Sequence, residues 1–132
     1  MHIKQKTITK AIQVQGIGLH TGNKVSMKLN PAPPNSGVVF RISKEGKTNY
    51  IRATYDNVKS TQLCTLISDS NGNTVSTVEH ILSALYGLEI DNVYVDLDSN
   101  EVPVGDGSSK IFVDLLKKNK LQSQSSFKKF IK

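Results

Sequence analysis

The spacing of apolar residues changes part-way along the chain, and this change limits the possible folds more than any other feature. Before Val78, apolar and polar residues alternate in short runs, as in half-buried β-strands. From Val78 to Gly87 the spacing is helical, and "NVYVDLD" then returns to alternation. The expected strands are residues 7–16, 24–29, 38–43, 50–58, 61–68, 74–75 and 92–98, with a tight hairpin turn at Asn71-Gly72.

Two amphipathic helices are expected, both late in the chain. Their apolar stripes are Val78, Ile81, Leu82, Leu85 and Tyr86 in the first helix, and Ile111, Phe112, Leu115 and Leu116 in the second. Many strands followed by two helices predict a single α+β domain, in which a mixed or antiparallel sheet of about five strands carries both helices on one face.

The length of 132 residues is that of one domain. We expect residues 1–120 to form this domain. Residues 121–132 are expected to be a linker, because "LQSQSS" is polar and of low complexity and "FKKFIK" resembles the start of a further segment.

The net charge of +6 does not indicate nucleic-acid binding, because of where the charge lies. Six lysines and no acidic residue follow residue 116, whereas the first 116 residues carry 11 basic and 11 acidic side chains. No basic face interleaved with aromatic residues, as a groove for DNA or RNA requires, occurs elsewhere in the sequence. We expect a solvated basic tail and no nucleic-acid partner.

The sequence carries no sign of a membrane span or of export. Its longest apolar run is far shorter than the roughly 20 residues that cross a bilayer, and "MHIKQKTITK" contains no apolar signal region. The single cysteine, Cys64, excludes an intrachain disulfide. These features favour a cytoplasmic protein that is not integral to a membrane.

Two adjacent polar residues, Glu79 and His80, stand at the start of the first helix, and each has two interpretations. "STVE" forms a capping box in which Ser76 caps the helix and the Glu79 carboxylate returns to the Ser76 amide, so stability alone accounts for the acid. With about 100° of rotation per residue, His80 lies nearly opposite the apolar stripe, beside Ser83 and Ala84. It is therefore either an ordinary surface residue or part of a site.

Two glycine-rich stretches either approach a ligand or simply turn the chain. "GIGLHTG" places three glycines around His20 but lacks the third glycine of a dinucleotide-binding fingerprint. "EVPVGDGSS" contains Asp106, which either caps the following helix or serves a site. Cys64 fits a small buried side chain in a strand. With three histidines and one cysteine, the sequence offers no complete zinc-binding pattern.

Five stretches of the chain match one family in a fixed order. They are "GIGLHTG", "NPAPPNSGVVFR", "TQLCTLI", "STVEHILSALYGLEIDNVYVDLDSNEVPVGDGSS" and "KKFIK". Together they resemble the N-terminal half of the bacterial UDP-3-O-acyl-N-acetylglucosamine deacetylases, the zinc hydrolases of lipid A synthesis. The resemblance covers nearly the whole chain, and the order of the motifs makes it more specific than any single motif.

This resemblance implies roles for both residues at the helix start. In the family the histidine of "STVEH" is a zinc ligand and the preceding glutamate is the general base, so His80 and Glu79 inherit these roles. Zinc polarises the amide carbonyl and acidifies water, while a neighbouring carboxylate accepts the proton. Positions that line the family's substrate site or lie near its catalytic centre match Leu19, His20, Leu63, Cys64 and Asp106. Gln62 replaces the methionine that the family often has there.

The resemblance also implies that part of the active site lies outside these residues. In the family the other two zinc ligands, from an H-K-x-x-D motif, and the acid histidine belong to a second domain of similar fold. We therefore expect this chain alone to bind zinc weakly and to be inactive, and the whole enzyme to release acetate from UDP-3-O-acyl-N-acetylglucosamine. The alternative is a non-catalytic binding or regulatory half-protein of the same fold.

Overall fold

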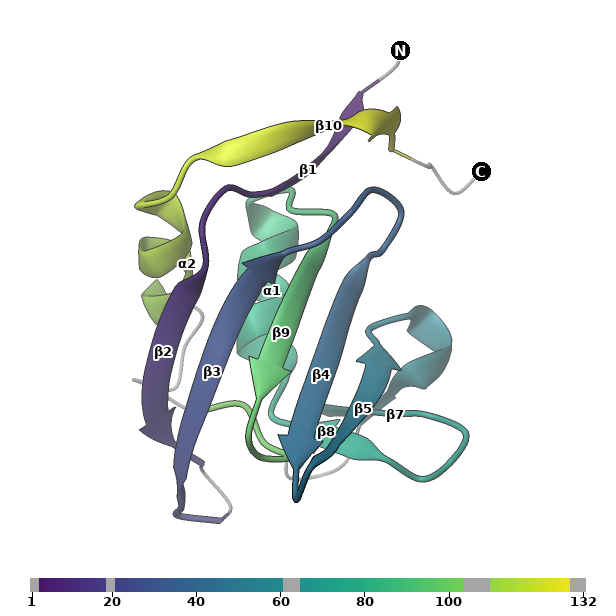
Figure 1. The fold of residues 1–132 in the computed structure, drawn as a ribbon, viewed down its shortest axis with the longest axis vertical. Helices are drawn as coiled ribbons and strands as arrows, with labels where there is room; N and C mark the ends of the chain where they lie inside the picture. The colour runs from purple at the N-terminus through teal and green to yellow at the C-terminus, as the bar shows by residue number, and fades with distance from the viewer. Residues whose placement is uncertain (1–2, 19–20, 61–64, 104–109, 129–132) are drawn as a thin grey trace.

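The computed structural model describes residues 3–18, 21–60, 65–103 and 110–128, and its centre is a mixed five-stranded sheet (Figure 1). The strands lie side by side in the order β2 (Ile12–Ile17), β3 (Lys24–Pro31), β9 (Val93–Leu97), β4 (Val38–Lys44) and β5 (Lys47–Arg52). Neighbouring strands are antiparallel, except that β9 and β4 are parallel. The last of these strands in the sequence therefore occupies the centre of the sheet.

Helices α1 (Glu79–Gly87) and α2 (Lys110–Lys117) share one hydrophobic core with this sheet, and α1 lies behind it in Figure 1. As the alternation predicts, Val93, Val95 and Leu97 of β9 face the core and are at most 3% exposed. The buried helix residues against them include Ile81, Leu85, Phe112 and Leu116. The predicted α+β fold is confirmed. Within the described ranges, no helix has the length and apolarity needed to cross a membrane.

A second, three-stranded antiparallel sheet consists of β6 (Val58–Ser60), β7 (Thr65–Ser68) and β8 (Thr74–Ser76). The predicted hairpin is present between β7 and β8, and Gly72 makes its turn with φ of +85°. A short 3-10 helix, η1 (Tyr55–Asn57), precedes β6. The single strand expected over residues 50–58 is therefore wrong, because the chain leaves the five-stranded sheet after Arg52.

The first and last strands of the described chain, β1 (Lys4–Ile8) and β10 (Leu121–Phe127), form a separate antiparallel pair (Figure 1). Two expectations change as a result. The strand expected over residues 7–16 is two strands, since β1 pairs with β10 whereas β2 pairs with β3. The stretch expected to be a linker contains β10. The proposed boundary of the domain at residue 120 stays a prediction.

Buried amide side chains explain why the polar segment of β10 is ordered. Asn92 is 1% exposed and donates from Nδ2 to the side-chain oxygens of Gln5 and Gln124, at 2.8 and 2.7 Å. Gln124 donates in turn to the Ala32 carbonyl oxygen at 2.8 Å, and Asn92 Oδ1 accepts from the Gly37 amide at 2.8 Å. We call Gln5, Asn92 and Gln124 the amide cluster. It joins β10 to the start of β9.

Candidate functional site at the start of helix α1

Helix α1 begins at Glu79, after a sharp turn that leaves β8. Thr77 makes this turn with φ of +61°, in the left-handed region that β-branched residues rarely enter. Val78 occupies the N-cap position, and no side chain caps the helix. The capping box predicted from "STVE" is therefore wrong. Ser76 is still part of β8, and its amide donates to the Asn100 carbonyl oxygen at 2.8 Å.

Glu79 is a partly buried side chain that is anchored to strand β7. Its Oε2 accepts a hydrogen bond from the Thr65 amide at 3.3 Å, and the Val78 amide donates to the Thr65 carbonyl oxygen at 3.2 Å. These two contacts tie the helix start to β7 and limit the directions that the carboxylate can take. The first turn of a helix also suits an acidic side chain, because the helix dipole is positive there.

His80 is partly buried and is not one of the core residues of α1. The buried side chains of this helix are Ile81, Leu82, Ala84 and Leu85. Ser83, one turn after His80, is exposed, and Tyr86 is 58% exposed. The predicted stripe is therefore wrong at Tyr86, and Ala84 is buried instead. His80 is not a core residue, as predicted, but Ala84, one turn after it, is buried, so His80 lies at the edge of the core face.

A second carboxylate, Glu101, lies next to the same turn and was not predicted. It is 2% exposed, and its Oε2 accepts from the Thr77 hydroxyl at 3.3 Å. Its Oε1 accepts from the Thr21 hydroxyl at 3.3 Å and from the Thr21 amide at 3.4 Å. We call Thr21, Thr77 and Glu101 the carboxylate cluster. The Glu101 side chain thus joins the start of α1 to the turn between β2 and β3. The one hint in the sequence is an acid directly before the apolar "VPV".

Glycines of the "GIGLHTG" stretch serve this cluster in two ways. Gly22 turns the chain with φ of +70°, and its amide donates to the Gly18 carbonyl oxygen at 2.9 Å. A Cβ at Gly18 would lie 2.1 Å from Glu101 Oε1 and 2.6 Å from Thr21 Oγ1. Gly18 is therefore required by the close approach of the chain to a protein carboxylate.

Only two of the residues predicted for the site, Glu79 and His80, lie in the described parts of the chain. The others, Leu19, His20, Leu63, Cys64 and Asp106, lie outside the described residues. Described neighbours of these stretches do meet at the start of α1. Thr21 reaches it through Glu101, and Thr65 reaches it through Glu79.

Comparison with known proteins identifies the family of the chain. The family model for UDP-3-O-acyl N-acetylglycosamine deacetylase matches residues 5–132. The chain belongs to this family. Curated proteins named UDP-3-O-acyl-N-acetylglucosamine deacetylase are 48% identical in Idiomarina loihiensis, 47% in Pseudoalteromonas atlantica and 42% in Haemophilus influenzae, each over 98% of this chain. The resemblance inferred from the ordered motifs is confirmed.

The chain spans only 42 to 43% of the length of these deacetylases. A chain of this length need not carry every ligand of the metal that the family implies. A catalytic zinc usually has three protein ligands and an open position. The described residues contain no group of three histidine, cysteine, aspartate or glutamate side chains that could hold a metal ion. His80 offers one imidazole and directly follows Glu79 in the sequence. This donor set fits a zinc site only as one ligand among several.

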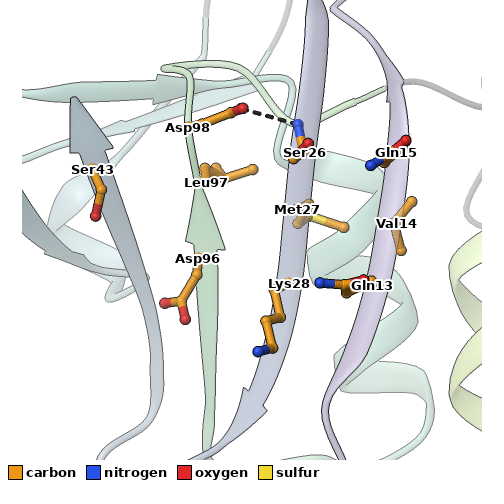
Figure 2. Close-up of a pocket in the computed structure, with 10 residues that line it drawn as sticks. All are labelled: Gln13, Val14, Gln15, Ser26, Met27, Lys28, Ser43, Asp96, Leu97 and Asp98. Carbon is orange, nitrogen blue, oxygen red and sulfur yellow. Dashed lines mark hydrogen bonds between the residues drawn. The ribbon is translucent and has the colours of Figure 1, made fainter. Parts of the chain in front are cut away.

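A pocket of about 200 Å³ lies on the outer face of the five-stranded sheet (Figure 2). Its polar lining consists of Gln13, Gln15, Ser26, Lys28, Ser43, Asp96 and Asp98. Asp96 accepts from Arg41 Nη2 at 2.7 Å, and this contact raises the pKa of Arg41, which also lies over the Tyr94 ring. Neither Glu79 nor His80 lines this pocket.

Proposed function

We propose that this chain supplies the general base and one zinc ligand of an enzyme that removes the N-acetyl group from UDP-3-O-acyl-N-acetylglucosamine. The observation that carries the proposal is the pair Glu79 and His80 at the start of α1, with Glu79 anchored to β7 and His80 outside the buried residues of the helix. Membership of the deacetylase family supports it. The remaining ligands and the acid are assigned to a second domain, which would approach the exposed side of α1 near Ser83.

In the proposed reaction, Glu79 accepts a proton from the water that attacks the acetamide carbonyl. Oε2 of Glu79 is anchored by the Thr65 amide, and within the described part of the chain Oε1 makes no hydrogen bond. One oxygen therefore fixes the carboxylate while the other is available for the proton. The carbon–nitrogen bond of the acetamide then breaks, acetate leaves, and the sugar amine takes a proton from the acid of the second domain.

His80 would hold the metal through its imidazole. Zinc bound there would supply a Lewis acid for the amide carbonyl and for water. His80 needs no rearrangement of the core to serve this role, because the buried side of α1 consists of other residues. A single cysteine is compatible with the reducing cytoplasm, which we propose as the location of the enzyme.

The test of the base is Glu79→Gln in a chain extended to include the second domain, with Glu89→Gln as the matched control. Glu89 is an exposed carboxylate after the other end of α1. We expect E79Q to lower turnover by about 10²–10⁴-fold, the usual contribution of a positioned acid or base. The melting temperature should hold, because the glutamine oxygen can still accept from the Thr65 amide. Near-full turnover with a lower melting temperature would show that Glu79 is only structural.

The test of the ligand is His80→Ala in the same extended chain, with zinc affinity measured by competition against a chromogenic chelator. We expect affinity and turnover to fall together, since a ligand is deleted. E79Q should leave zinc affinity close to that of the unmodified protein. The 132-residue chain alone should bind zinc weakly and show no turnover. Tight stoichiometric binding by that chain would contradict the assignment of the other ligands to a second domain.

A further inference from the structure

Glu101 is held at its backbone as well as at its side chain. Residues Ser76 and Glu101 form a parallel β-bridge, which places Glu101 beside the end of β8. The Ser76 amide donates to the Asn100 carbonyl oxygen at 2.8 Å, and the Val102 amide donates to the Ser76 carbonyl oxygen at 3.1 Å. The main chain on both sides of Glu101 is therefore fixed to the residue that precedes the Thr77 turn.

The Thr77 turn needs such support. A β-branched residue in the left-handed region is strained, and strained residues persist where their surroundings hold them. Thr77 is 3% exposed, and its hydroxyl donates to Glu101 Oε2 at 3.3 Å. The backbone at Thr77 sets the direction in which the chain enters α1, because only Val78 separates it from Glu79.

The start of α1 is thus fixed from two sides. On one side, Thr65 of β7 exchanges hydrogen bonds with Val78 and Glu79. On the other side, the Glu101 carboxylate holds Thr77 and, through Oε1, Thr21. Glu101 itself stays buried and lies between the two turns, so its contribution to the site passes through the backbone that it holds.

We propose that Glu101 is a positioning residue for Glu79 and His80, an inference that rests on the proposed function. Its carboxylate keeps Thr77 in the left-handed conformation and so sets the place from which the base and the metal ligand project. A catalytic group displaced by about 1 Å can cost about 10²-fold in rate. Positioning of this kind lowers kcat more than it raises KM when it is lost, because Glu101 is 2% exposed and acts through the backbone that it holds.

The first measurement is amide hydrogen exchange on the 132-residue chain. Glu101→Gln should speed exchange of the Thr21 amide and of the Val78 amide, since both turns lose a carboxylate partner. The matched control is Asp98→Asn, which alters an exposed carboxylate on the same connection, where Oδ1 accepts from the Ser26 amide at 2.9 Å. D98N should leave Thr21 and Val78 unchanged.

The second measurement is turnover in the extended chain, with Thr77→Gly as a rescue. Glycine adopts a positive φ at no steric cost, so it removes the need for Glu101 to hold this turn. We expect E101Q to lower kcat by about 10–100-fold with KM within about threefold. In the T77G background, E101Q should lower kcat by a much smaller factor. Exchange at Val78 should be slow again, while Thr21 stays fast.

Rescue separates positioning from a general loss of stability, since T77G restores no contact to Thr21. If E101Q does not fold, Thr77→Val replaces the hydroxyl with a methyl group, and this loss of the hydrogen bond should still lower kcat and speed exchange at Val78. Full kcat in E101Q, or a loss of kcat that T77G leaves unchanged, would overturn the proposal. If the unmodified extended chain shows no turnover, the proposed function fails, whereas the exchange experiment still decides whether Glu101 holds the Thr77 turn.

Discussion

Two clusters of polar side chains, each centred on a buried residue, lie at opposite ends of β9, and they differ in construction. The amide cluster, at the start of the strand, is neutral, and its hydrogen bonds measure 2.7 to 2.9 Å. The carboxylate cluster, beyond the end of the strand, centres on an acid, and its hydrogen bonds measure 3.3 to 3.4 Å. It also contains Thr77 in a strained conformation.

The amide cluster joins β10 to the sheet, whereas the carboxylate cluster has the proposed role of shaping a site. Buried amides that are fully paired over short distances favour one arrangement of the core. They fix β10 against the sheet, far from Glu79. Strained residues often occur where function depends on one backbone conformation, which is the role proposed above for the Thr77 turn. We therefore expect the amide cluster to dominate the free energy of unfolding and the carboxylate cluster to dominate activity.

Asn92→Ala should have the largest effect on stability of any single change in these clusters. It removes three hydrogen bonds and takes the partner from the Gly37 amide and from the Gln124 side-chain oxygen, whereas Gln5 Oε1 keeps the Asn35 amide at 2.8 Å. Because each buried unsatisfied group costs about 1–3 kcal/mol, we expect a total loss of about 3–5 kcal/mol. Urea unfolding measures this loss.

The control for N92A is Asn100→Ala, since Asn100 is exposed and donates one hydrogen bond of 3.2 Å to the Thr74 carbonyl oxygen. We expect N100A to change the free energy of unfolding by about 0.5 kcal/mol or less. Equal effects of the two variants would show that burial of the amide cluster adds little to stability, and the comparison between the two clusters would lose its basis.

Gly18→Ala should have the next largest effect, because the carboxylate cluster has no room for a methyl group. The new Cβ would lie 2.1 Å from Glu101 Oε1, so the carboxylate and Thr21 must both move. Overpacking of this kind costs about 1–3 kcal/mol. The control is Gly87→Ala at the end of α1, where a Cβ meets nothing within 4 Å. Urea unfolding should show G87A to be as stable as the unmodified chain or slightly more stable.

A double variant sharpens this prediction. If the clash with Glu101 is the cause, Gly18→Ala should cost less in a chain that also carries Glu101→Ala. Residues in contact typically show a coupling of about 0.5–3 kcal/mol. If the losses in free energy of unfolding from the two changes simply add, the clash with Glu101 is not the cause of the G18A effect.

Lys128→Met should loosen β10 by a smaller amount. Lys128 Nζ donates to both carboxylate oxygens of Asp91, at 2.7 and 2.8 Å, and these side chains are 15% and 26% exposed. With a discount for this exposure, we expect a loss of about 1 kcal/mol. Amide hydrogen exchange in residues 121–127 should become faster. The control is Lys4→Met, at an exposed position on β1, which should leave amide exchange in residues 121–127 unchanged.

Alternation and helical spacing predicted most elements of this fold. They failed where one alternating run contains a change of partner, as over residues 7–16, because alternation indicates which side is buried and not which strand lies alongside. The polar composition of "LQSQSS" predicted a linker, because the sequence does not distinguish a glutamine with hydrogen-bond partners in the fold, such as Gln124, from one that faces solvent. Pairing partners are properties of the folded chain.

In the candidate site, too, some residues could be predicted from the sequence and others could not. The adjacent Glu79 and His80 could be predicted, because the helical pattern places His80 off the core face and the ordered motifs assign both roles. Glu101 could not, since its partners lie 24 and 80 residues away in the sequence. Thr77 could not either, because its positive φ contradicts its local propensity and depends on those distant contacts.

The smallest expected effect concerns Asp69, at the solvent-facing turn between β7 and β8, which gives a baseline for both clusters. The hydrogen bond from the Asn73 side chain, followed by the Asn73 and Asn71 amides, lowers the pKa of Asp69. A lowered pKa in the folded state adds stability that is present above the pKa of the unfolded chain and is lost as the pH falls through the folded value.

Asn73→Ala should therefore raise this pKa towards its ordinary value and weaken the loss of stability in acid. Asn71→Ala keeps its backbone donor and should leave the pKa low. The carboxyl carbon shift in an NMR titration reports both results. If N73A moved the free energy of unfolding as much as N92A does, burial would not be what distinguishes the clusters from an exposed turn.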